Sequence, residues 1–349
     1  MPIKIYEDRI ELGAKVITTT PTGIRIDDSL AANTQAQGYI KQANFTAREL
    51  AFGNFVFQGS VAGFTSGGLV PPNTQQNVID KFPFATNTNA TDVGDLTQAR
   101  NLPAGQSSSV SGYTSGGYGG GRQNTIDKFQ FSSNSNARDV GDLTQARNES
   151  AGASSVVSGY TSGGTAPGDS NVIDKFPFAT DTNATDVGDL ITAKDRVAGQ
   201  SSTSSGYVTG GRVNPPGVTQ NTIEKFPFAA DTNATDVGDL SQARQVVAGQ
   251  SSSTNGYASG GIGPAPGIVN TIEKFPFASD TNATDIGDLS EARSDLAGQS
   301  STSSGYSSGG VSGSPTSNTI DKFPFSTDTN ASDVGDLSVS RNRVTGQQF

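Results

Sequence analysis

The sequence predicts an all-β fold in which six similar four-stranded units close into a ring. Its main signal is a Gly-aromatic-x-x-Gly-Gly motif that recurs six times, with the aromatic residue at Phe64, Tyr113, Tyr160, Tyr207, Tyr257 and Tyr306. A period of about 50 residues holds about four strands with short connections. Glycine pairs, Phe-Pro-Phe segments and β-branched residues disfavour helix, and no stretch has the 3.6-residue apolar spacing of one.

Each repeat contains four predicted strands, named A to D in chain order. Strand A has the form AGQSSS, strand B SGYTSGG, strand C N-T/V-I-D/E-K-F-P-F and strand D ATDVGDLTQAR. Four antiparallel strands repeated around an axis form the blades of a β-propeller, whose closure leaves no long unpaired edge. The copies fill residues 63–341, which predicts a six-bladed propeller.

The two ends of the chain leave the number of blades open between two arrangements. KIYEDRIEL, KVITTT and GIRIDDS alternate like strands, and AFGNFVFQGSVAGF is similar to strands A and B of a first blade. The final RNRVTGQQF is similar to one more strand A. We therefore expect an N-terminal β module at residues 1–47 and a six-bladed propeller at residues 48–349, in which the last strand replaces or reinforces part of blade one. The alternative is seven blades, one of them built from both termini.

The repeats resemble the kelch family of β-propellers over about 280 residues. The resemblance rests on the double glycine that ends strand B, the aromatic residue three positions before it, and a strand C aromatic at Phe82, Phe129, Phe176, Phe226, Phe275 and Phe323. Kelch repeats normally carry a Trp in strand D, and this chain has no Trp. The resemblance therefore implies a kelch-like propeller and no particular function.

The repeated residues are expected to be structural. The aromatic pair of K-F-P-F and the Leu of G-D-L should pack between neighbouring blades, where buried apolar area stabilises the ring. The paired glycines should allow close backbone approach near the axis, or a bulge. The recurrent G-D-L-x-x-A-R predicts an Asp and Arg pairing, for example Asp142 with Arg147.

The acidic stretch FATDTNATDVGDL raises the question of a calcium site. Its candidate oxygen ligands are Asp181, Asn183, Asp186 and Asp189. Their spacing breaks the every-second-residue pattern of a calcium loop, and no bidentate Glu closes it. A four-residue D-T-N-A hairpin loop between strands C and D explains the same residues, because Asp and Asn favour turns. We favour the turn and expect no metal there.

Comparison of the six copies predicts which end of the propeller binds a ligand. The segment after the double glycine differs in every copy, from YGGGRQ to RVNPPGVTQ, and so does the D-to-A connection, whereas the A-to-B and C-to-D connections hardly change. Because successive strands alternate in direction, the two diverse connections lie at one end of the propeller. Loops on a rigid scaffold carry function, so the candidate ligand-binding residues are Tyr118, Arg122, Asp169, Arg212 and Asn214.

The composition limits the chemistry. The chain of 349 residues has a formal charge of −10 and a pI near 4.5, so nucleic acid is not expected as a partner. It has no His and no Cys, which removes the usual general base, the thiol nucleophile and ordinary zinc sites. We expect no enzyme activity, no catalytic residue and no cofactor. Neither a signal-peptide-like run nor about 18 successive apolar residues occurs, so membrane insertion is not expected.

The order of segments resembles that of phage virion appendages, in which an N-terminal part docks to the particle and distal repeats face the host. The resemblance implies a fibre-like or decoration protein located in the virion, with other virion proteins as partners of residues 1–47. It also implies a host-surface glycan or protein as ligand. The alternatives are a cytoplasmic kelch-type interaction scaffold and a carbohydrate-active enzyme or lectin. Homo-oligomerisation is left open.

Overall fold

The computed structural model describes residues 58–264, 267–313 and 316–349, together with four short strands near the N-terminus. The chain divides into two units, Met1–Phe55 and Val56–Phe349. The expected boundary between residues 47 and 48 lies outside the described residues.

The N-terminal unit contains one four-stranded antiparallel sheet in which neighbours in sequence are neighbours in space. Its strands are β1 (Ile3–Ile5), β2 (Arg9–Leu12), β3 (Lys15–Thr20) and β4 (Gly23–Ile26). KVITTT and GIRI form β3 and β4 as predicted, whereas KIYEDRIEL, expected to alternate as one segment, is divided between β1 and β2.

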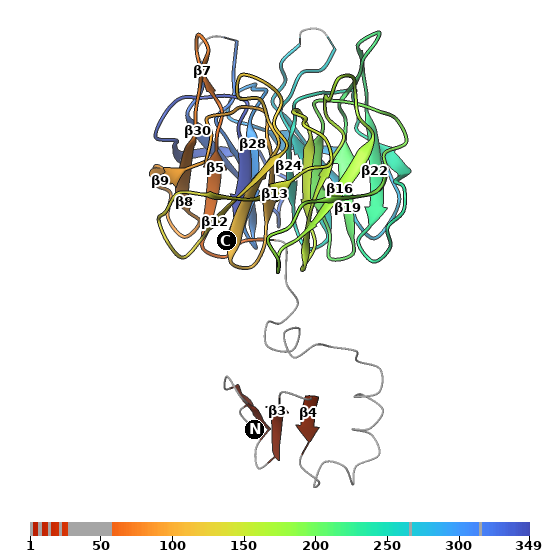
Figure 1. Ribbon diagram of the computed structural model, residues 1–349. Coiled ribbons are helices and arrows are strands. Elements are labelled where there is room, and N and C mark those ends of the chain that lie inside the picture. Colours follow the sequence, from red (N-terminus) through yellow and green to blue (C-terminus); the bar gives the residue numbers. More distant parts are fainter. Residues whose placement is uncertain are drawn as a thin grey trace. The chain divides into compact units, whose positions relative to one another are not determined.

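The second unit is a six-bladed β-propeller, seen from the side in Figure 1, and each blade is a four-stranded antiparallel sheet. Blade 1 consists of β32 (Thr345–Gln348), β5 (Ala62–Ser66), β8 (Val78–Pro83) and β9 (Thr91–Asp95). Blade 2 consists of β10 (Ala104–Ser107), β11 (Ser111–Ser115), β12 (Thr125–Gln130) and β13 (Arg138–Asp142). Blade 3 consists of β14 (Ala151–Ser154), β15 (Ser158–Ser162), β16 (Val172–Pro177) and β17 (Thr185–Asp189).

The remaining three blades have the same order. Blade 4 consists of β18 (Ala198–Ser201), β19 (Ser205–Thr209), β22 (Thr222–Pro227) and β23 (Thr235–Asp239). Blade 5 consists of β24 (Ala248–Ser251), β25 (Asn255–Ser259), β26 (Thr271–Pro276) and β27 (Thr284–Asp288). Blade 6 consists of β28 (Ala297–Ser300), β29 (Ser304–Ser308), β30 (Thr319–Pro324) and β31 (Ser332–Asp336). Two B-to-C connections carry small hairpins, β6 (Leu69–Val70) with β7 (Thr74–Gln75) and β20 (Arg212–Val213) with β21 (Val218–Thr219).

The last strand of the chain closes the ring. β32 takes the strand A position of blade 1 and pairs with β5. The expectation that the last strand replaces or reinforces part of blade one is therefore confirmed. The residues just before Gly63 do not supply strand A of this blade, although their sequence is similar to one, and the seven-bladed alternative is wrong. The preceding described residues instead contact other blades, since the Gly59 amide donates to Ser300 O at 2.8 Å and the Gln58 side chain donates to Ser251 O at 3.0 Å.

Aromatic side chains pack between neighbouring blades, as predicted. The Tyr113 ring of strand B stacks on Phe178 of the next blade at 4.8 Å between centroids and lies 5.5 Å from Phe176. The same contacts recur around the ring. The glycine before the aromatic residue is needed for this packing, because a Cβ at Gly112 would lie 2.3 Å from the Phe129 ring of its own blade.

Burial of the strand B tyrosines predicts unfolding at alkaline pH. Burial raises the pKa of Tyr113 and Tyr306 to about 12, and it also raises the pKa of Tyr160, Tyr207 and Tyr257. Since the unfolded phenol titrates near 10, the neutral form stabilises the fold below about pH 10, and this stability is lost as the pH rises toward 12. We expect phenolate absorbance and loss of β circular dichroism to develop together in this interval.

The control for this titration is Tyr118→Phe, because Tyr118 is 40% exposed. That variant should leave the pH midpoint of unfolding unchanged. Ionisation of the buried tyrosines near pH 10 with an unchanged circular dichroism spectrum would contradict the prediction.

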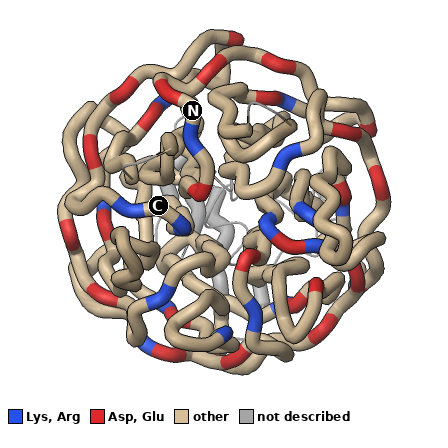
Figure 2. Tube along the Cα trace, turned by 90° about the horizontal axis from the view of Figure 1, so that it is seen from above, with Lys and Arg blue, Asp and Glu red and all other residues tan. Residues whose placement is uncertain are grey.

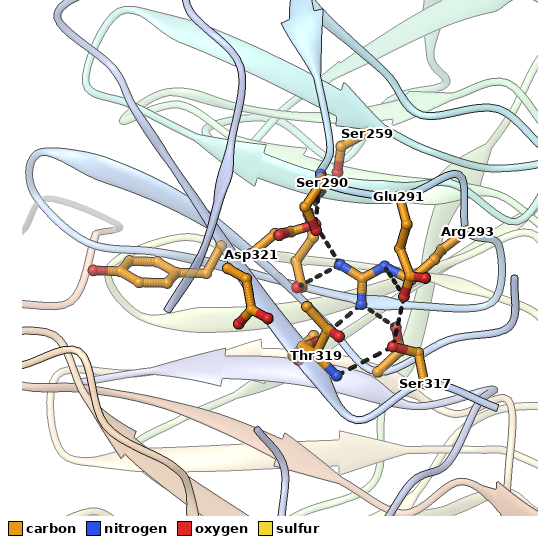
Figure 3. Close-up of polar contacts among 12 residues, drawn as sticks. Ser259, Ser290, Glu291, Arg293, Ser317, Thr319 and Asp321 are labelled. Carbon is orange, nitrogen blue, oxygen red and sulfur yellow. Dashed lines mark hydrogen bonds and ion pairs between the residues drawn. The ribbon is translucent and has the colours of Figure 1, made fainter. Parts of the chain in front are cut away.

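A buried ion pair spans each of the six blade interfaces. The cation follows strand D of one blade and the acid lies on strand C of the next, and both side chains are almost completely buried. The pairs are Arg100 with Asp127, Arg147 with Asp174, Lys194 with Glu224, Arg244 with Glu273, Arg293 with Asp321, and Arg341 with Asp80. Figure 3 shows the Arg293 guanidinium close to Glu291, Thr319 and Asp321. The predicted pairing of Asp142 with Arg147 is wrong, because the partner of Arg147 comes from the following blade at 3.0 Å.

The double glycines allow close backbone approach, as predicted, but at the end of strand B and not at the axis: a Cβ at Gly116 would lie 2.5 Å from the Arg147 carbonyl oxygen. They end strand B with positive φ, 63° at Gly116 and 105° at Gly117, a region that glycine adopts at little cost. The closest approach at the axis is made by the glycine of strand A. A Cβ at Gly152, for example, would lie 2.1 Å from the carbonyl oxygen of Gly105 in the preceding blade.

Candidate functional site

The acidic stretch at residues 178–189 contains residues that hydrogen-bond to the preceding blade. Residues 178–184 form a longer loop than the expected four-residue hairpin. The Asp142 amide of the preceding blade donates to Asn183 Oδ1 at 3.1 Å, and the Ala184 amide donates to Asp142 O at 2.8 Å. Equivalent Asn contacts occur at all six interfaces. The loop is longer because its end binds the neighbouring blade.

The four candidate calcium ligands have separate contacts in the structure. Asp181 forms ion pairs with Lys128 at 3.1 Å and Arg138 at 2.6 Å, and these cations lower the pKa of Asp181. Asp186 Oδ1 accepts from the Gly188 amide at 3.2 Å, while Asp189 lies at the end of β17. Within the described part of the chain, no group of three or more acidic residues has the arrangement of a metal site.

The two ends of the propeller differ in the way that comparison of the copies indicated. We call the end with the B-to-C and D-to-A connections the variable face, and the end with the A-to-B and C-to-D connections the uniform face. The β6–β7 hairpin marks the variable face at the top of Figure 1. The five candidate ligand-binding residues all lie on B-to-C connections of this face.

Tyr118 and Arg122 lie on blade 2. The Tyr118 backbone exchanges two hydrogen bonds with Asn101, at 2.8 and 3.1 Å, which fix this loop to the D-to-A connection. Arg122 borders an open hollow with Gln145 and Pro167. Pro167 lies on the connection that carries Asp169, so this hollow reaches from blade 2 to the loop of the next candidate.

Asp169, Arg212 and Asn214 meet at the junction of blades 3 and 4. The Asn214 amide donates to Asp169 Oδ2 at 2.5 Å, and the Arg212 guanidinium donates to both carboxylate oxygens of Asp195, at 3.2 and 2.8 Å. Burial raises the pKa of Asp169 despite the opposing effect of the Asn214 amide. Sequence reasoning missed Asp195, although its position in a diverse D-to-A triplet pointed to it.

The same network continues toward the propeller axis. The Thr165 hydroxyl lies 3.1 Å from Glu149 Oε2 and 3.2 Å from Asp195 Oδ2. Arg196 then pairs with Glu149 through Nε at 3.1 Å and donates to Gln245 at 3.2 Å. Burial raises the pKa of Glu149, and Arg196 partly offsets that rise.

A ring of six residues surrounds the axial opening on the variable face. Each is the middle residue of a D-to-A triplet, and each amide donates to the carbonyl of its predecessor at 2.8 to 3.2 Å, so that the hydrogen bonds close around the axis. All six have positive φ, between 52° and 62°, although none is glycine. We call these residues the mouth ring: Leu102, Glu149, Arg196, Val246, Asp295 and Arg343.

The mouth ring borders a cavity of about 70 Å³. Its inner wall consists of the next residue of each triplet, mostly apolar: Pro103, Ser150, Val197, Val247, Leu296 and Val344. Figure 2 looks down on this face and shows both signs of charge around the central opening. Burial also raises the pKa of Asp295, against the opposing effect of Arg343. The rim thus combines apolar walls with a few polar groups, and because the cavity is much smaller than the roughly 300 Å³ of a usual ligand pocket, a ligand would bind at this rim and not inside it.

Comparison with known proteins gives no family for this chain. No protein-family model matches it, and no curated protein does. Among the residues that the structure describes, there is no helix of the length and apolar character needed to traverse a bilayer.

Proposed function

We propose that this chain is a structural protein of a phage virion, a fibre-like or decoration protein with a kelch-like propeller. Its variable face binds a glycan on the host surface. The observation that carries the proposal is the difference between the two ends of the propeller. The chain enters at the uniform face, where Gly59 contacts Ser300 and Thr302 of blade 6, and the diversified loops lie at the opposite end.

This difference between the ends supports an attached protein that presents one end to a variable partner. Connections on the uniform face repeat almost unchanged because they hold the blades together, as the Asn183 contact does. Connections on the variable face join the blades through backbone hydrogen bonds, such as those between Asn101 and Tyr118, which do not depend on the side chain. They differ in all six copies. A rigid scaffold with one diversified face suits recognition of a surface ligand.

The proposal is tested by two measurements on bacterial cultures infected by the phage that carries this gene. The protein should copurify with particles through a density gradient at a fixed copy number per particle. Purified protein added before infection should slow adsorption of the particles, whereas protein with the variable-face loops of blades 3 and 4 replaced by Gly-Ser segments should not. A free protein that never sediments with particles would refute the virion assignment.

A further inference from the structure

We propose that the Asp295 and Arg343 half of the mouth ring is the primary subsite for a neutral sugar residue. This inference rests on the proposed function, since it names the class of ligand that the variable face binds. It is carried by the arrangement of charges around the axial cavity.

The mouth ring has an approximate twofold pattern. Reading around the axis, an apolar residue, an acid and an arginine are followed by the same three types: Leu102, Glu149 and Arg196, then Val246, Asp295 and Arg343. Each half therefore places a carboxylate next to a guanidinium at the cavity rim. The four charges sum to zero.

In the first half of the mouth ring, the charged side chains are already hydrogen-bonded to other side chains of the protein. Glu149 accepts hydrogen bonds from Arg196 and Thr165, and Arg196 also donates to Gln245. The guanidinium and the carboxylate are thus both held by neighbouring side chains, and a ligand would have to displace those contacts.

The second half is open. The Arg343 side chain is exposed and makes no hydrogen bond or ion pair with the part of the chain that the structure describes. The side chain of Asp295 is half-buried and has a single weak contact, with the Ser294 hydroxyl at 3.4 Å. A free donor and a nearly free acceptor therefore stand beside one another at the cavity.

The backbone conformation indicates that the mouth-ring side chains have a role beyond the backbone hydrogen bonds of the ring. Positive φ costs a non-glycine residue free energy, most of all a β-branched one such as Val246. Glycine would form the same ring of backbone hydrogen bonds without that cost. A chain with 43 glycines places none at these six positions, so side chains are favoured where glycine would be easier.

The chemistry of the open half selects a neutral polyol. A carboxylate only accepts hydrogen bonds and a guanidinium only donates them, whereas a sugar hydroxyl does both, so adjacent hydroxyls satisfy the two groups together. The apolar wall at Leu296 and Val344 can contact the C–H groups of a sugar ring. An anionic sugar would bring its carboxylate close to Asp295 and Glu149, whose repulsion offsets the attraction of Arg343.

The test is titration of the full-length protein with free glucose, galactose and mannose, and with glucuronic and N-acetylneuraminic acids, followed by ligand-observed NMR. At least one neutral sugar should bind with a dissociation constant in the roughly millimolar range expected for so few contacts. Arg343→Gln and Asp295→Asn should each weaken that binding about 10-fold or more, because each removes a hydrogen bond to a charged group. Arg138→Gln, an exposed arginine at the uniform-face end of strand D in blade 2, should bind like the unchanged protein.

Each alternative result overturns a defined part of the inference. Binding of anionic sugars alone would refute the ligand class. Neutral sugar binding that both ring variants leave unchanged, with thermal unfolding confirming that they are folded, would refute the subsite. Binding of none of the five sugars would refute the inference as a whole. The proposed function fails separately, by the particle and adsorption measurements, and survives if the variable face binds a different host glycan.

Discussion

Removal of residues 345–349 is expected to open the propeller and to lower its unfolding temperature by roughly 10 °C or more. The deletion removes β32, which pairs with β5 from Thr345 opposite Ser66 to Gln348 opposite Gly63. It leaves the inner edge of blade 1 without hydrogen bonds and leaves a gap between the inner strands of blades 6 and 2. Differential scanning calorimetry and size-exclusion chromatography would measure the loss.

The side chains of this strand explain why so short a deletion has so large an effect. Gln347 Nε2 donates to Ser66 Oγ at 3.0 Å and reaches blade 2 at Tyr113 O and Thr114 Oγ1, both at 3.1 Å. Phe349 stacks on Phe131 at 5.2 Å between centroids. Each buried hydrogen bond contributes about 1 kcal/mol, and the groups left unpaired cost more.

A deletion of similar size elsewhere separates loss of closure from loss of length. Shortening the β20–β21 hairpin by five residues, at the tip of a variable-face loop, removes no blade strand. Its unfolding temperature should change by no more than about 2 °C, since surface changes of this kind have small effects. Equal destabilisation by the two deletions would show that β32 has no special role in closing the ring.

The fold could be predicted because its signals are local and repeated. The spacing of the strand B aromatics gave the number of units, and the alternation within K-F-P-F placed Phe176 and Phe178 at the blade interface. Pairings between blades could not be predicted in the same way. Arg147 lies closer in sequence to Asp142 than to Asp174, and only the ring geometry places Asp174 beside it.

One buried contact between blades shows that two residues in contact can be replaced together in one copy of the repeat. In five blades a strand A glutamine donates to strand B of the next blade, as Gln106 does to Thr161 Oγ1 at 3.0 Å. In blade 3 the glutamine is replaced by Ala153, and the residue opposite it, at the position of Thr161, is Val208. An apolar pair thus replaces a polar one. The sequence contains both changes, but only the structure shows that they are in contact.

The candidate site was predicted in part for a related reason. Diversity among the copies identified the variable-face loops and led to Asp169, Arg212 and Asn214, which meet at the junction of blades 3 and 4. The residues of the mouth ring are not among those that the sequence predicts, although their triplets differ among the copies. The left-handed backbone of the ring and its convergence on the axis depend on closure of all six blades, so no single repeat reveals them.

Breaking one buried ion pair at a blade interface is the second large effect that we expect. Arg293→Met leaves Asp321 charged and buried, and Asp321→Leu leaves Arg293 in the same condition. The two groups lie 2.6 Å apart with both side chains completely buried. Each single variant should lose about 3 to 5 kcal/mol of unfolding free energy, because the remaining charge stays buried without its close partner. Asp321 keeps only the Ser290 amide at 3.2 Å, and the nearest acid left to Arg293 is Glu291 at 3.7 Å. Chemical denaturation at constant pH would measure this.

The double variant distinguishes an unpaired charge from a lost contact. Arg293→Met combined with Asp321→Leu removes both charges and should recover part of the lost stability. Recovery should be incomplete, because Arg293 also donates to Gly309 O at 2.7 Å and Thr319 O at 2.9 Å, and those carbonyls lose a donor. Arg138→Met, at an exposed pair with Asp181, is the matched control and should cost less than about 1 kcal/mol. A double variant as unstable as the sum of the singles would mean that the two residues stabilise the interface independently, and the ion pair would then not be what links the blades.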